Sequence, residues 1–74
     1  MRKDTRMYHV SDGFERNRGF EEFKAAEKYA RKITAKDGTV CLIWHGGKTL
    51  ATTSRDVNLK VWTDYTFDGA ALLL

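Results

Sequence analysis

Few residues in this chain could carry out covalent or metal chemistry: its 74 residues include one cysteine and two histidines. Cys41 and His45 share one side of a predicted strand, but about 13 Å separates them along it, too far for a thiolate–imidazole pair. A structural metal site needs four suitably spaced ligands, and these two residues with His9 do not supply them. We therefore predict no catalytic, metal or cofactor site and no enzymatic activity.

Cations gather instead on one predicted helix. When successive residues are turned by about 100° each, the side opposite the apolar residues carries Lys24, Lys28, Arg31 and Lys32. Two more cations, Arg16 and Arg18, lie in the segment just before the helix. A cationic helix face suits a phosphate backbone or an acidic protein surface, because each neutralised phosphate releases counterions. The alternative is a solvated face that only keeps the protein in solution.

A second candidate contact lies on a predicted strand. Trp62 has the parity of Lys60, opposite that of the apolar residues around it, so it is expected on the side of the sheet that faces away from the helix. There Lys60 and Trp62 could stack a base or anchor a protein partner. In the alternative interpretation, Tyr65, Phe67 and the terminal leucines cover this side.

Composition limits the class of protein. A 74-residue chain with 42% hydrophobic and 31% charged residues is typical of one small folded domain. Its net charge of +3 is uneven: residues 1–36 hold ten basic and six acidic side chains, and residues 37–74 hold three and four. The lone cysteine is expected to be a buried, reduced thiol, and no signal peptide or membrane span is evident, so we expect a cytoplasmic protein.

The first half of the chain predicts a strand, a loop and a helix. Alternation over residues 5–11 indicates the strand, and the polar residues 14–19 indicate the loop. Residues 20–36 have the 3.6-residue period of a helix, with Glu21 and Glu22 in its first turn and Gly38 ending it. The expected buried stripe is Phe23, Ala26, Tyr29, Ala30 and Ile33.

The second half predicts three strands. Residues 39–45 and 48–53 flank Gly46-Gly47, which is typical of a two-residue hairpin turn. A second turn at residues 54–56 is expected to lead into a strand at residues 57–63. The order β-α-β-β-β predicts an α+β fold in one domain, residues 1–74, with one helix packed on a small antiparallel sheet.

The last residues, 64–74, end in an apolar tract that could be an extra strand, an edge cover or a tail. Through this tract or an edge strand the chain could also form a weak homodimer rather than remain a monomer.

The segment FEEFKAAEKYARKITAKDGTVCLIWHGGKTLATT, residues 20–53, resembles the compact helix-then-hairpin proteins that phages and mobile elements encode against host machinery. That group includes anti-CRISPR proteins and inhibitors of host RNA polymerase. The resemblance implies a non-catalytic inhibitor that docks on a nucleic-acid-handling host complex, such as a CRISPR effector. The alternatives are a nucleic-acid-binding domain that uses the basic helix face and a regulator of host RNA polymerase.

Overall fold

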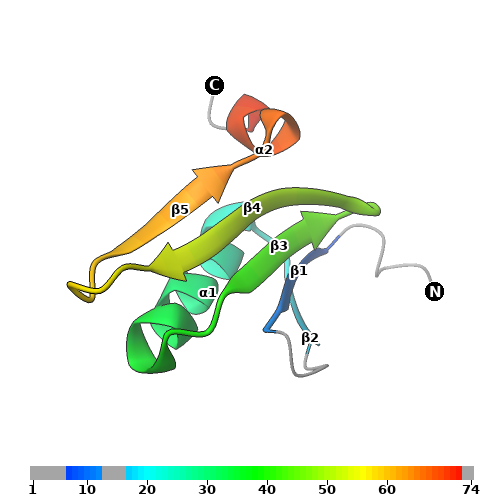
Figure 1. Cartoon of the computed structure of the whole chain (residues 1–74). Helices are drawn as coiled ribbons and strands as arrows, with labels where there is room; N and C mark the ends of the chain where they lie inside the picture. Colours follow the sequence, from blue (N-terminus) through cyan, green and yellow to red (C-terminus); the bar gives the residue numbers. More distant parts are fainter. Residues whose placement is uncertain (1–6, 13–16, 73–74) are drawn as a thin grey trace.

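One long helix lies against one face of a five-stranded antiparallel sheet (Figure 1). The computed structural model describes residues 7–12 and 17–72. Along the chain the elements are β1 (Tyr8–Ser11), β2 (Asn17–Phe20), α1 (Phe23–Asp37), β3 (Cys41–His45), β4 (Lys48–Arg55), β5 (Val61–Tyr65) and α2 (Phe67–Ala71). The strand order in the sheet is β2-β1-β3-β4-β5. This arrangement confirms the predicted α+β class with one helix on an antiparallel sheet.

Helix α1 forms because its apolar residues recur on one side, which it buries against the sheet. Phe23, Ala26, Ala30 and Thr34 are buried on that side. Gly38 ends the helix with a left-handed φ of 81°, and its N–H donates to the Thr34 carbonyl at 2.8 Å. The helix begins at Phe23, so the expectation that two glutamates occupy its first turn is wrong. Glu22 is its N-cap residue, with an extended backbone.

The core combines apolar side chains with one buried hydroxyl pair. Thr34 on α1 and Thr53 on β4 are fully buried, with their hydroxyl oxygens 2.7 Å apart. The Thr34 hydroxyl also donates to the Thr39 carbonyl at 2.6 Å, so it links the helix to both the sheet and the segment that follows. The buried apolar residues are Val10, Phe23, Ala26, Ala30, Cys41, Ile43, Leu50 and Ala51.

The β3–β4 hairpin confirms the predicted glycine turn. Gly46 and Gly47 have φ angles of 59° and 82°, which other residues rarely adopt. The register shifts at Ile43, where a β-bulge leaves Leu50 without a partner across the strands. Leu50 is nevertheless buried, at 5% exposure, so the bulge places two consecutive residues of β4 in or next to the core.

The predicted loop at residues 14–19 is wrong in its second half, because Asn17–Phe20 forms β2 and pairs with β1. The segment is too short and polar to show a strand pattern. It is held by contacts that the sequence pattern does not display, such as Phe20 against Tyr29, with ring centroids 5.2 Å apart. Residues 5 and 6 of the predicted first strand and 14–16 of the predicted loop lie outside the described residues.

The turn before the last strand lies later than predicted. Strand β4 continues through Arg55, and the turn occupies residues 56–60. The Asp56 carboxylate accepts from the N–H groups of Asn58 and Lys60 at 2.8 and 2.9 Å, and Leu59 adopts a left-handed φ of 65°. Val57 and Leu59 were expected on the core side of a strand, but they are 95% and 68% exposed. The hydrogen bonds accepted by the Asp56 carboxylate thus stabilise a turn where the alternating pattern predicts a strand.

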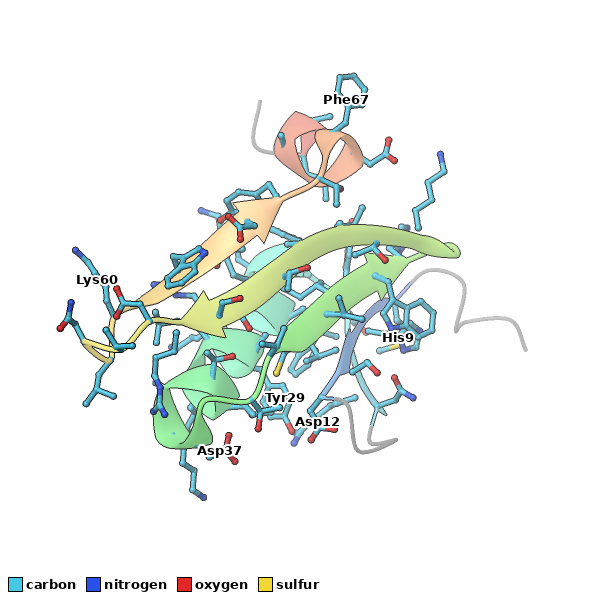
Figure 2. The ribbon with its side chains drawn as sticks, in the orientation of Figure 1. His9, Asp12, Tyr29, Asp37, Lys60 and Phe67 are labelled. Atoms are coloured by element: carbon cyan, nitrogen blue, oxygen red, sulfur yellow. The ribbon has the colours of Figure 1, made fainter. Side chains whose placement is uncertain are left out.

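The last described residues form a short helix that packs against β4 rather than an extra strand, and residues 73 and 74 of the apolar tract lie outside the described residues. Thr66 caps α2 by accepting from the Gly69 N–H at 3.1 Å, and its own N–H donates to the Leu50 carbonyl at 2.9 Å. Gly69 is buried against β4, whereas Phe67 points outward and is 89% exposed (Figure 2). Helix α2 therefore closes the end of β4 and leaves its own apolar side chains in solvent.

Candidate functional site: the lysine ridge of helix α1

Four lysines line the solvent side of α1 at four-residue intervals: Lys24, Lys28, Lys32 and Lys36, which we call the lysine ridge. All four are exposed, as are the alanines beside them, Ala25 and Ala35. Four residues of helix rise about 6 Å, so the ridge is about 18 Å long and turns about 120° around the helix. Within residues 7–12 and 17–72, none of the four lysines forms an ion pair or a side-chain hydrogen bond. Hydrogen bonds from Thr39 and, after them, the charge of Lys36 lower the pKa of the neighbouring Asp37. The ridge is therefore a row of positive charge without bonded partners that has one carboxylate beside its last lysine.

Arg31 does not belong to this solvent-facing row, so the prediction that it points outward is wrong. It is half-buried and reaches β5, where its guanidinium donates to the Val61 carbonyl at 3.1 Å and to the Thr63 hydroxyl at 2.9 Å. The Lys60 carbonyl accepts from the backbone N–H of Asp56, which lies on the β4 side. Successive carbonyls along a strand point in opposite directions, so the Val61 carbonyl points to the outer edge of the sheet. Arg31 thus caps part of an edge strand that would otherwise expose unpaired backbone groups.

A second polar contact fastens the same flank of the helix to β5. The Tyr65 hydroxyl donates to the Glu27 carboxylate at 2.5 Å. Partial burial raises the pKa of Tyr65, and the hydrogen bond and negative charge of Glu27 raise it further. With Glu27 and Arg31 both turned toward β5, the remaining exposed positions of α1 carry lysine and alanine, except for Asp37 at its last position, whose carboxylate accepts from the N–H and hydroxyl of Thr39.

Trp62 and Lys60 lie away from the ridge. Trp62 is 37% exposed on the open sheet face, the side of the sheet that α1 does not cover. Its indole Nε1–H donates to the Asp64 carboxylate at 3.0 Å, which orients the ring. Lys60 is in the β4–β5 turn rather than on the strand, and it points outward (Figure 2). The predicted site residues therefore do not form one surface, because Trp62 lies on the open sheet face and Lys60 in the β4–β5 turn.

The open sheet face carries aromatic and apolar side chains among polar ones. His9 stacks on Trp44 across β1 and β3, with ring centroids 4.5 Å apart. Leu42 and Val40 are 43% and 52% exposed beside them. Tyr65 does not cover this face, since its ring lies 6.2 Å from that of Phe23 on the helix side. Nor does Phe67, which is directed into solvent.

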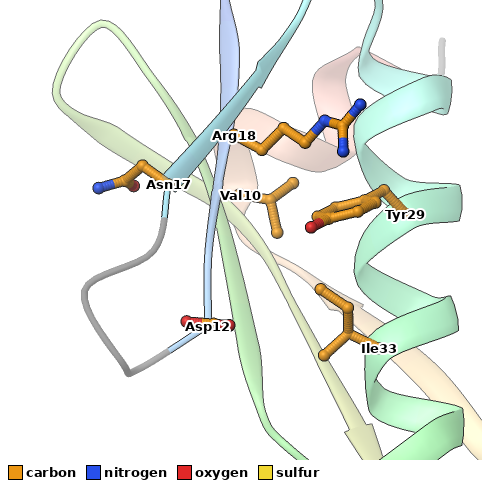
Figure 3. A pocket seen from close by; sticks show the side chains of 6 residues that line it. All are labelled: Val10, Asp12, Asn17, Arg18, Tyr29 and Ile33. Atoms are coloured by element: carbon orange, nitrogen blue, oxygen red, sulfur yellow. The ribbon is translucent and has the colours of Figure 1, made fainter.

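Arg18 lies at the opposite edge of the sheet, on β2. Its guanidinium carbon lies 5.2 Å from the centre of the Tyr29 ring and 5.7 Å from that of Phe20. Together with Val10, Asp12, Asn17 and Ile33, Arg18 and Tyr29 line a cavity of about 220 Å³ between α1 and the first two strands (Figure 3). This volume is below the roughly 300–1,000 Å³ typical of ligand pockets, so we assign it no ligand. The other predicted loop cation, Arg16, lies outside the described residues.

The two histidines and the cysteine do not form a common site: each histidine stacks on an aromatic ring, and the cysteine lies in the core. His45 stacks on Tyr8, with centroids 4.4 Å apart, and its Nδ1 lies 3.0 Å from the Met7 carbonyl oxygen. Cys41 is fully buried, and this burial raises the pKa of its thiol, so the thiolate is disfavoured at neutral pH. The part of the chain that the structure describes contains no group of three potential metal-ligating side chains.

Sequence reasoning missed Lys36 as part of the site, although the four-residue spacing from Lys32 was a sufficient signal. It also missed the contacts that hold Arg31 and Glu27 to β5, for which no local signal exists.

Comparison with known proteins finds no relative of this chain. The chain matches no protein-family model, no curated protein and no solved structure. In the described residues, no helix is both long enough and apolar enough to span a bilayer. The functional argument therefore depends on the geometry of the chain alone.

Proposed function

We propose that this protein is a non-catalytic binding protein that docks through its lysine ridge on an anionic surface of a nucleic-acid-handling complex. One observation carries the proposal: four lysines occupy one side of α1, and within the described residues none of them forms an ion pair or a side-chain hydrogen bond. Each of the three neighbouring pairs, such as Lys24 with Lys28, brings like charges one helical turn apart. Such pairs destabilise a helix by about 0.2–0.5 kcal/mol each. A polyanionic partner would relieve this repulsion.

The rest of the fold is consistent with a dedicated outward surface. The acidic residue and the arginine in the middle of α1, Glu27 and Arg31, are held against β5 by hydrogen bonds. Neither is free to pair with a lysine. The sheet behind α1 fixes the helix through buried side chains, so the lysines are presented on a rigid element rather than on a loop.

Chromatography on heparin, a general polyanion, tests whether binding depends on the ridge itself or only on the net positive charge of the protein. The ridge variant Lys28→Gln/Lys32→Gln and the control variant Lys48→Gln/Lys60→Gln each remove two positive charges from exposed lysines. We expect the control to elute at nearly the salt concentration of the wild type and the ridge variant to elute clearly earlier. Equal shifts for the two variants, or no retention of the wild type, would contradict the proposal.

The open sheet face favours a second candidate function, docking on a protein. Aromatic residues are enriched at such interfaces, and Trp62 is both exposed and oriented by Asp64. The narrower hypothesis, a phage-type inhibitor of a CRISPR effector or of host RNA polymerase, belongs to this candidate. Affinity capture from a nuclease-treated bacterial lysate should then recover one defined complex, and Trp62→Ser should lose it. Recovery of the same proteins by both forms would count against this function.

A further inference from the structure

The composition of the ridge narrows the class of its partner. We infer that the lysine ridge binds the phosphate backbone of double-stranded DNA without reading its bases, an inference that rests on the function proposed above.

The side-chain chemistry of the ridge favours phosphates over an acidic protein. Protein interfaces are enriched in aromatic residues, methionine and arginine and depleted in lysine. The ridge and the exposed positions beside it hold the reverse, four lysines and two alanines, while Arg31 is bonded to β5 and the exposed Asp37 ends the helix. Lysine binds phosphate as a mobile point charge and does not impose a planar paired geometry. A row of such charges suits an extended line of phosphates.

The same positions lack arginine, asparagine and glutamine, which read bases by paired hydrogen bonds, and aromatic rings, which stack bases. Direct readout in the major groove is most specific where a planar guanidinium or amide makes two hydrogen bonds to one base, whereas lysine offers only a point charge to guanine. Binding of unpaired strands relies on exposed aromatic rings that stack the bases. Among the exposed aromatic residues, Trp62 lies on the opposite side of the sheet from α1 and Phe67 projects from α2. The Tyr65 hydroxyl is bonded to Glu27, and Tyr29 is half-buried beneath Arg18. The ridge is therefore suited to a duplex and to contacts independent of sequence.

The dimensions of α1 favour DNA over duplex RNA. An α-helix with its side chains is about 10–12 Å wide, close to the roughly 12 Å width of the B-form major groove. The major groove of A-form RNA is too deep and narrow to admit side chains. Because the ridge turns about 120° from Lys24 to Lys36, its lysines can reach phosphates on both walls of the wider groove. The small side chains of Ala25 and Ala35 allow the helix to approach closely.

Fluorescence anisotropy with labelled nucleic acids tests the inference. The probes are two 20-base-pair DNA duplexes of unrelated sequence, one of their single strands and a duplex RNA, each titrated between 50 and 200 mM salt. Four phosphate contacts give a log–log slope of about −3.6, equivalent to an affinity loss of about 150-fold over this range. We expect both DNA duplexes to bind within about twofold of each other and more tightly than the other probes, by the same non-specific electrostatic mechanism. The ridge variant should lower the slope to about −1.8, while the Lys48→Gln/Lys60→Gln control keeps the wild-type slope.

Two outcomes separate this inference from the proposed function. If heparin retains the wild type through the ridge but duplex DNA does not bind, or binds less tightly than single strands or duplex RNA, the inference fails and the proposed function stands. If the ridge variant binds every polyanion as the wild type does, both fail. A preference of more than about tenfold between the two DNA sequences would overturn the claim that bases are not read.

Discussion

Replacing Lys28 by glutamine should stabilise the protein, because this lysine has a like-charged neighbour one turn away on each side. At about 0.2–0.5 kcal/mol per pair, removal of both repulsions should raise the free energy of unfolding by about 0.4–1.0 kcal/mol. Glutamine and lysine have similar helix propensities, so the change of side chain itself costs little. For a domain of this size the gain corresponds to a rise in Tm of about 2–8 °C. The expected sign is unusual, since most substitutions destabilise.

Thermal and urea unfolding at about 10 mM and 1 M salt measure this effect. The Debye length falls from about 30 Å to about 3 Å between these conditions, so the gain should be present at low salt and largely lost at high salt. Lys48→Gln, which removes a charge away from α1, is the matched control and should change little. A loss of stability in Lys28→Gln, or a gain that persists at 1 M salt, would refute the assignment of Lys28 to an unpaired row.

Three further predictions concern the contacts that hold the flanks of the fold. Arg31→Met should lower the free energy of unfolding by about 1–2 kcal/mol and speed hydrogen exchange of the β5 amides, because two hydrogen bonds to that strand are lost; unchanged exchange would contradict this. Gly69→Ala should detach α2 or unfold the chain, since the new Cβ would lie 1.9 Å from the Leu50 carbonyl oxygen; a wild-type Tm would refute it. Because the pKa of Tyr65 is raised in the folded protein, the unfolded chain loses this proton first as the pH rises. The contribution of Tyr65 to the free energy of unfolding should therefore be fully present below about pH 10 and fall above it. Glu27→Gln should reduce that alkaline loss, as urea titrations at several pH values would show, and an unaltered pH dependence would count against the contact.

The elements with strong local signals could be predicted from the sequence. The apolar period of α1, its glycine stop at Gly38 and the Gly46-Gly47 hairpin turn are all present as expected. Each depends on residues close together in the chain, where periodicity and the freedom of glycine to adopt positive φ are decisive.

The elements held by contacts between residues far apart in the chain could not be predicted from the sequence. Strand β2 has no apolar alternation and exists because it pairs with β1. The alternation of Val57, Leu59 and Val61 predicted a strand, but the carboxylate of Asp56 organised a turn around the first two. At the candidate site, spacing located Lys24, Lys28 and Lys32 correctly but Lys36 was missed, and the contact of Arg31 with β5 depends on residues thirty positions further along the chain.

Titration of isotope-labelled protein with a DNA duplex, followed by amide and indole NMR signals, tests most directly whether α1 is the binding surface. The account predicts that the amides of residues 24–36 shift on binding, together with the lysine side chains, while the Trp62 indole signal stays in place. Shifts centred on Trp62 and the open sheet face, with α1 unaffected, would contradict it.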